Sequence, residues 1–149
     1  MDTPGLYARR FPALDRAVEL GVVGGKVVGV SFPDEPPADA AAEHPLLDRF
    51  EAYLGGEADD FADVDVGLTV PADQRRVLEA VRSIPYGRTL SIDRIARMAG
   101  LDDDAEDDLA TVERALRENP VPLFVPDHRV EGPGATPDAV ARQFRRLEG

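Results

Sequence analysis

The sequence predicts an α+β fold, in which a small sheet-containing domain precedes a helical domain that contains a helix-turn-helix pair. Two apolar runs, residues 17–23 and 26–32, flank Gly24-Gly25 and predict a β-hairpin, because a tight hairpin turn needs two residues with positive φ. From residue 69 onward, apolar residues recur at the three- and four-residue spacing of amphipathic helices. A proline-rich segment, residues 119–130, interrupts the helical pattern.

The domain boundaries follow from shifts in this pattern. Residues 1–16 show no sustained period and are predicted to be an N-terminal extension. Residues 17–67 are predicted to form the small α/β domain, in which Pro45 begins a helix, Gly55-Gly56 ends it and an acidic linker follows. Residues 69–149 are predicted to form the helical domain.

Four helices are predicted in the helical domain, and they span residues 73–84, 91–99, 105–117 and 136–149. Ser91 is the expected N-cap of the second helix, because a serine hydroxyl can accept a hydrogen bond from a first-turn N–H group. The second and third are short helices joined by a turn. This arrangement predicts a helix-turn-helix pair whose second member is the recognition helix.

The chain is strongly acidic, with 29 aspartate and glutamate residues, 17 basic residues and a net charge of −12. Lys26 is the only lysine, and the composition resembles that of salt-adapted haloarchaeal proteins. At about 1 M salt the Debye length is only ~3 Å, so an acidic surface does not repel nucleic acid over a long range. The sign of the net charge therefore excludes no class of partner.

Several classes of protein are excluded by what the sequence lacks. It contains no cysteine, which excludes disulfides, cysteine-based zinc sites and thiol catalysis. It contains no run of 18 apolar residues and no signal-peptide pattern, so we expect a cytoplasmic protein without membrane contact. The two histidines, His44 and His128, do not have the spacing of metal ligands, so no metal is expected. No cofactor is expected either. We expect the protein to be a monomer.

The segment from Asn119 to Val130 is the most informative stretch. Its three prolines prevent a helix and favour extended backbone. The apolar run Leu123-Phe124-Val125 favours burial, so the segment should deliver Asp127, His128 and Arg129 to one fixed place. Three consecutive titratable residues at the end of a buried segment indicate a site.

This segment resembles the active-site motif of the methylated-DNA–protein-cysteine methyltransferases, the alkylguanine repair proteins. The family motif is N-P-x-P-x-x-x-P-C-H-R-V, and this chain has N-P-V-P-L-F-V-P-D-H-R-V, with Asp127 in place of the cysteine. Ile84-Pro85-Tyr86-Gly87 and the Gly-Glu-x-x-Asp-Phe link before it also resemble the family. The resemblance implies a C-terminal domain of the winged-helix-like, DNA-binding type.

In the family, a cysteine thiolate attacks the alkyl carbon of a flipped guanine, and a neighbouring histidine activates it through water and a glutamate. The resemblance places His128, Asn119 and, near the chain end, Glu148 at family active-site positions. A carboxylate is a poor carbon nucleophile beside a thiolate, so no catalytic residue is expected. Methyl transfer to Asp127 is a remote alternative.

Other positions also depart from the family pattern. Ala110 stands where an arginine fills the gap left by the flipped base, and Glu113 stands where a glycine lets the helix approach DNA. Ile92 stands where a tyrosine is expected, and Gly132-Pro133-Gly134 is all that matches a glycine-rich segment after the motif.

Asp127 has two interpretations. It either accepts hydrogen bonds from the N–H groups of the next turn or pairs with Arg129, as a structural residue. Alternatively it lies on the floor of a base-sized pocket and accepts from an exocyclic amine, a pairing that the O6 acceptor of guanine would not support.

The expected DNA-contacting residues are Arg88, Ser91, Arg94, Arg114, Arg117 and Arg129. The arginines of the first two helices could instead cover apolar surface or pair within their helices. The acidic residues around the recognition helix are either a salt-adapted, solvated face or a surface that has abandoned phosphate contact or now contacts a basic protein.

Together these observations favour a non-catalytic alkyltransferase-like protein. Relatives of the family that lack the cysteine bind damaged DNA and pass it to other repair proteins, so DNA and a repair protein are the expected partners. The alternative is a structural or regulatory protein that has kept the fold and lost DNA binding.

Overall fold

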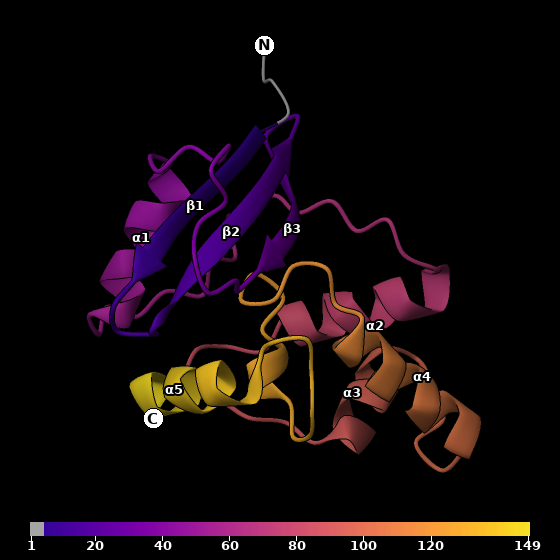
Figure 1. Ribbon diagram of the computed structural model, residues 1–149. Helices are drawn as coiled ribbons and strands as arrows, with labels where there is room; N and C mark the ends of the chain where they lie inside the picture. The colour runs from indigo at the N-terminus through magenta and orange to yellow at the C-terminus, as the bar shows by residue number, and fades with distance from the viewer. Residues whose placement is uncertain (1–4) are drawn as a thin grey trace.

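The computed structural model describes residues 5–149, in which a three-stranded sheet lies to one side of a group of helices (Figure 1). The antiparallel sheet has the order β1-β2-β3, with β1 at Gly5–Phe11, β2 at Arg16–Val23 and β3 at Lys26–Ser31. The turn between β2 and β3 contains Gly24 and Gly25, whose φ angles are 57° and 78°. The predicted hairpin is therefore confirmed.

The predicted extension is wrong for its described part, because residues 5–11 form the strand β1. Its register runs from Gly5 opposite Val22 to Phe11 opposite Arg16. Only Ala8 and Phe11 in this strand are buried, so its sequence lacks the two-residue period that identifies a half-buried strand. Residues 1–4 of the predicted extension lie outside the described residues.

Five α-helices match the predicted helices to within two residues at each end. They are α1 at Pro45–Leu54, α2 at Ala72–Arg82, α3 at Ile92–Met98, α4 at Glu106–Arg117 and α5 at Asp138–Glu148. Ser91 is the N-cap of α3, and its hydroxyl accepts a hydrogen bond from the Arg94 N–H at 3.2 Å. Gly100 follows α3 with a φ of 79°, a left-handed conformation that glycine adopts without strain.

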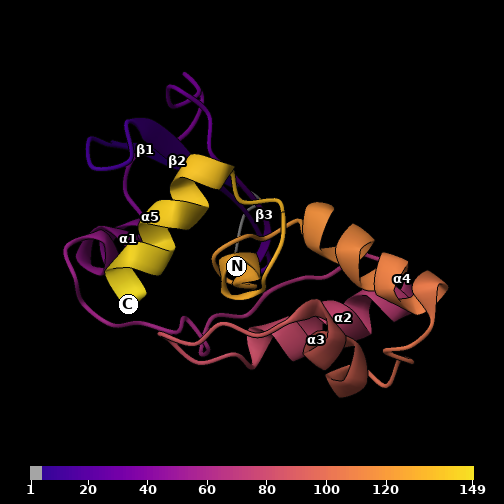
Figure 2. The same ribbon diagram turned by 90° about the horizontal axis from the view of Figure 1, so that it is seen from below.

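The last helix, α5, packs against the sheet half of the molecule and not among α2, α3 and α4 (Figure 2). An aromatic cluster makes this contact. The ring of Phe144 in α5 lies 5.8 Å from that of Phe50 and 5.5 Å from that of Tyr53, both in α1. Phe50 also packs edge-on against Phe11 of β1 at 5.0 Å. Both ends of the chain therefore share one core.

The segment from Asn119 to Val130 lies between these two halves, and every residue from Val121 to Val130 is buried. The Val30 N–H of β3 donates to Pro120 O at 2.9 Å, and Arg82 of α2 donates to Phe124 O at 3.2 Å. The segment ends in a single turn of 3-10 helix, η1, at Asp127–Arg129. Within residues 5–149, every helix is too short or too polar to cross a lipid bilayer.

Replacing Ser91 with alanine should lower the free energy of unfolding by about 1 kcal/mol, because the first turn of α3 loses its capping acceptor. Chemical denaturation in concentrated salt measures the change. Thr89→Ala, at an exposed neighbouring position, is the matched control and should change stability by less than about 0.5 kcal/mol. Equal effects of the two substitutions would contradict the capping role.

Candidate functional site

Asn119 folds the proline-rich segment back on itself. Its side-chain amide donates to Val125 O and to the Asp127 carboxylate, both at 3.0 Å, and its carbonyl accepts from the Val121 N–H at 3.1 Å. Leu123 takes a positive φ of 79° at the tip of the resulting turn. The prolines limit the alternatives open to this backbone, and Asn119 fixes the conformation that brings Asp127 into the interior.

The carboxylate of Asp127 is buried and accepts four hydrogen bonds. One oxygen accepts from the Thr136 hydroxyl at 2.6 Å. The other accepts from Asn119 Nδ2 at 3.0 Å, from the Ala135 N–H at 3.0 Å and from the Thr136 N–H at 3.3 Å. Three of the four donors converge on a single oxygen, which therefore has no acceptor capacity left, and the other oxygen is held by the Thr136 hydroxyl. Asp127 thereby fastens the segment before α5 to the proline-rich turn.

The loop after η1 closes tightly over Asp127. A Cβ atom placed on Gly134 would lie 2.7 Å from Cγ of Asp127, so only glycine fits at position 134. Asp127 and Thr136 are each 2% exposed. Burial raises the pKa of Asp127, and the hydrogen bonds from Thr136 and Asn119 act in the opposite direction.

The geometry of the site distinguishes between the two interpretations of Asp127. The hydrogen bonds from the next turn are present, whereas the alternative pairing with Arg129 is not, because Arg129 binds Glu148. Asp127 does line a pocket, but its oxygens already have donors, so the geometry does not support it as an acceptor for an exocyclic amine.

Glu148, at the end of α5, is the second centre of the site. Its Oε2 lies 2.6 Å from His128 Nε2 and accepts from the Tyr53 hydroxyl. Its Oε1 accepts from Arg129 Nε at 2.7 Å and from the Gly87 N–H at 3.2 Å. The structure therefore brings Glu148 directly to His128 and connects both to α1 through Tyr53.

Charged neighbours and burial shift the pKa of Glu148 in opposite directions. Burial alone would raise the pKa of Glu148, but the hydrogen bonds from His128 and Arg129 outweigh it and hold the pKa well below its usual range. Burial and the neighbouring carboxylate raise the pKa of the Tyr53 hydroxyl, which stays protonated and acts as a donor. His128 is oriented by Glu148 through its Nε2 atom.

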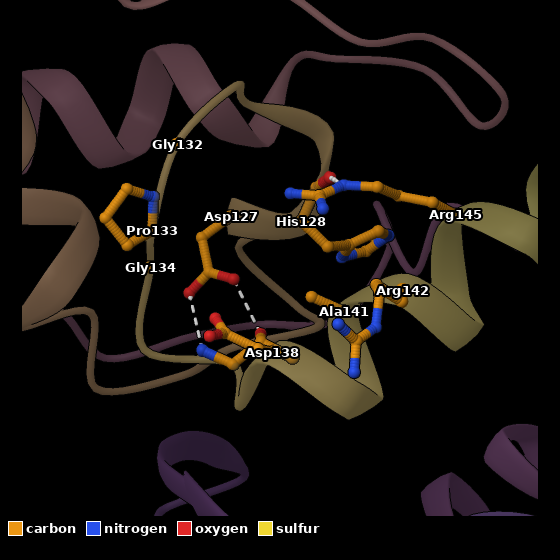
Figure 3. A pocket seen from close by; sticks show the side chains of 10 residues that line it. Asp127, His128, Gly132, Pro133, Gly134, Asp138, Ala141, Arg142 and Arg145 are labelled. Atoms are coloured by element: carbon orange, nitrogen blue, oxygen red, sulfur yellow. Dashed lines mark hydrogen bonds between the residues drawn. The ribbon is translucent and has the colours of Figure 1, made fainter.

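A pocket of about 400 Å³ opens beside this network, between the loop after η1 and the first turns of α5 (Figure 3). Figure 3 shows Asp127 between the loop and the α5 residues. The pocket is lined by Asp127, His128, Gly132, Pro133, Gly134, Thr136, Asp138, Ala141, Arg142 and Arg145. Arg145 is fixed at its edge, because its Nε donates to His128 O at 2.7 Å.

The predicted DNA-contacting residues do not share one environment. Four of the arginines, Arg88, Arg94, Arg114 and Arg117, are exposed, and Arg117 lies 3.7 Å from Glu113 on the same helix. Arg129 is 2% exposed and donates to Glu148 and to Ile84 O, so its prediction as a surface contact is wrong. Glu148 is 19 residues away along the chain, and sequence spacing does not reveal that contact.

The positions that depart from the family pattern lie beside the loop or on α4. A Cβ atom on Gly132 would lie 3.3 Å from Cδ1 of Ile92, so Ile92 packs against the loop backbone. Ala110 is exposed and Glu113 is half-buried on α4. The surface of α4 therefore presents no arginine at position 110.

Three residues that shape the site were missed by the sequence reasoning. Thr136 supplies two donors to Asp127, Tyr53 binds Glu148 and Arg145 binds the carbonyl of His128. The position of Thr136 immediately before Pro137 predicts only a helix start. Nothing local in the sequence connects Tyr53 to a partner that is 95 residues away.

Asp127→Asn should lower the free energy of unfolding by about 2 kcal/mol or more, because the neutral amide oxygen is a weaker acceptor than the carboxylate for the buried donors of Asn119, Ala135 and Thr136. Thermal and chemical denaturation measure the loss. Asp138→Asn is the matched control, since Asp138 lines the same pocket but is exposed. A loss of similar size in both variants would refute the clamping role of Asp127.

The stability contributed by Glu148 should depend on pH. Because its folded-state pKa is lowered, the contribution is present above the ordinary glutamate pKa of about 4.3 and is lost as pH falls toward the folded-state pKa. The gap in unfolding free energy between the wild type and Glu148→Gln should therefore be largest near neutral pH and shrink below about pH 4. Exposed Glu131→Gln is the control, and a pH-independent gap would contradict this account.

The sequence is similar to those of known proteins. Residues 72–146 match the family described as 6-O-methylguanine DNA methyltransferase, DNA binding domain. A DNA base-flipping protein of Thermus thermophilus is 38% identical over 100 residues, which cover 66% of this chain and 64% of that protein. The chain thus spans slightly less than two thirds of the Thermus protein. A methylated-DNA–protein-cysteine methyltransferase of Methanopyrus kandleri is 38% identical over 68% of this chain and 75% of that protein.

Solved structures match nearly the whole chain. A single-residue variant of Mycobacterium tuberculosis OGT has 25% identity and a TM-score of 0.77, and the match covers 98% of this chain and 93% of that one. The M. tuberculosis OGT in complex with DNA has 25% identity and a TM-score of 0.72, over 96% and 91% of the two chains. The sequence family, the relative from M. kandleri and the shared fold agree, and this chain therefore belongs to the 6-O-methylguanine DNA methyltransferase family.

Proposed function

We propose that this chain is a non-catalytic, alkyltransferase-like protein that binds DNA in DNA repair. The observation that carries the proposal is the state of Asp127, which stands where the motif has its reactive cysteine, is 2% exposed and accepts four hydrogen bonds. The similarity to a DNA base-flipping protein and to a structure of OGT in complex with DNA supports the DNA-binding part.

The chemistry of position 127 disfavours methyl transfer. A carboxylate oxygen would have to attack the methyl carbon while the bond from that carbon to guanine O6 breaks, and an ester would result. Both oxygens of Asp127 already accept hydrogen bonds, which lower their nucleophilicity, and no cysteine is present in the sequence to replace them.

We assign DNA contact to residues 69–149, through the exposed arginines Arg88, Arg94, Arg114 and Arg117. Ser91 belongs to the same surface, although its hydroxyl caps α3. Acidic residues flank these arginines on α4, among them Glu106, Asp107 and Asp108. Concentrated salt screens the repulsion between these carboxylates and phosphate, so binding under salt-adapted conditions depends on short-range contacts.

The acidic flank also defines the second candidate, a structural or regulatory protein that has lost DNA binding. The two candidates differ in one observable, which is the affinity for a duplex in concentrated potassium chloride. Fluorescence anisotropy with a labelled duplex, with and without O6-methylguanine, measures this affinity directly.

The wild type should bind the duplex, and the double variant Arg94→Gln/Arg114→Gln should bind it about tenfold more weakly, because two charge-assisted contacts are lost. Arg10→Gln, on the distant strand β1, is the control and should bind like the wild type. Mass spectrometry of the intact protein after incubation with the O6-methylguanine duplex should show no added methyl group. If the wild type binds neither the plain duplex nor the O6-methylguanine duplex, the proposal is wrong. A methyl adduct on Asp127 would contradict the non-catalytic part of the proposal.

A further inference from the structure

The exposed positive charge nearest to the pocket lies on α5 and not on α4. The exposed face of α5 carries Arg142, Arg145 and Arg146, with Asp138 as its exposed acidic residue. Helix α4 has four acidic residues and two arginines, and one of those arginines already lies near Glu113. An anion that approaches the Asp127–His128 region therefore meets a more favourable potential from the α5 side.

The pocket at this side has features of a small-ligand site. Its volume of about 400 Å³ falls within the usual range for small-molecule pockets, which is roughly 300–1,000 Å³. Arg142 and Arg145 both line the pocket from α5, and Figure 3 shows their side chains on either side of His128. Arg145 is held by the carbonyl of His128, so its guanidinium keeps a fixed position at little entropic cost on binding.

Two further observations indicate that the pocket is incomplete without a partner. No side chain caps the N-terminus of α5, whose first N–H groups follow Pro137 and carry the positive end of the helix dipole. His128, whose side chain is fully buried and which lines the pocket, has an Nδ1 atom without a hydrogen-bond partner among the described residues. Buried polar atoms are rarely left unpaired, so a ligand or ordered water at the pocket floor would satisfy this atom.

The acidic residues of the pocket oppose this attraction only in part. Asp127 directs its oxygens at four donors from Asn119, Ala135 and Thr136. Asp138 is exposed to solvent in the first turn of α5. Arg142 can form a bidentate contact with phosphate oxygens, and Arg145, whose Nε and Nη2 donate to His128 O and Val130 O, can add its remaining N–H groups.

We propose that this pocket binds the phosphate group of a nucleotide, with Arg142 and Arg145 as its ligands on α5. This inference deepens the proposed DNA-binding function and rests on it for the source of the phosphate. The phosphate can belong to a free nucleotide or to a DNA strand, and the same chemistry recognises both. Arg142 and Arg145 then determine which part of the molecule contacts the nucleic acid backbone.

The test compares two probes, deoxyguanosine 5′-monophosphate and deoxyguanosine, by titration calorimetry at constant salt. The monophosphate should bind, and deoxyguanosine should bind at least about tenfold more weakly, because only the phosphate engages both arginines. Equal affinity for the two probes, or no binding of the monophosphate, would overturn the inference.

Variants on α5 provide the residue-level test. Arg142→Gln should weaken binding of the monophosphate by about tenfold, and Arg145→Lys should weaken it less because it keeps the charge. Arg146→Gln is the matched control, since Arg146 is exposed on the same helix but does not line the pocket. Thermal denaturation verifies that each variant is folded. Equal affinities of the wild type and Arg142→Gln would overturn the assignment.

A labelled duplex separates this inference from the proposed function. If Arg142→Gln weakens duplex binding as well, the phosphate belongs to DNA and both proposals are supported. If the duplex binds but depends only on Arg94 and Arg114, and the monophosphate does not bind, the DNA-binding function stands and the α5 inference fails. If the monophosphate binds through Arg142 and no duplex binds, the α5 site stands and the DNA-binding function fails.

Discussion

The hydrogen bonds that converge on the Asp127 carboxylate are the constraint on which the rest of the site depends. An ionised carboxylate is costly to bury without donors, and Asn119, Ala135 and Thr136 supply them at 2.6 to 3.3 Å. These contacts join the proline-rich turn to the segment before α5, and they draw Gly134 so close that no side chain fits there. A thiol could not accept four hydrogen bonds of this strength. Aspartate at this position therefore has a structural role, because its carboxylate joins two segments of the interior.

The second centre of the site is Glu148, at the end of α5. It receives hydrogen bonds from His128, Arg129 and Tyr53, and thereby joins the chain end to α1 and to the 3-10 turn. The structure thus keeps His128 and Glu148 in direct contact. Glu148 stabilises the interior of the protein, because its carboxylate orients the buried ring of His128 and pairs with the buried Arg129.

Local sequence patterns predicted most of the fold, since the Gly24-Gly25 turn, the Ser91 cap and the helical periods depend on neighbouring residues. The buried segment from Asn119 to Val130 was also predictable, because its prolines and apolar run restrict it locally. Strand β1 was not, because just Ala8 and Phe11 are buried and its partner strand supplies the order. The burial of Arg129 and the contacts of Thr136 and Tyr53 could not be predicted either. They depend on how α5 returns to the sheet half, which is set by the aromatic packing of Phe144.

The central claim is that Asp127 holds the segment before α5 in place, and amide hydrogen exchange at Ala135 and Thr136 tests it most directly. In the wild type both N–H groups donate to the carboxylate and should exchange slowly. Asp127→Ala should accelerate exchange at these two amides by an order of magnitude or more, while amides in the middle of α2 exchange at rates that change far less. Unchanged exchange at Ala135 and Thr136 in a folded Asp127→Ala variant would contradict the claim.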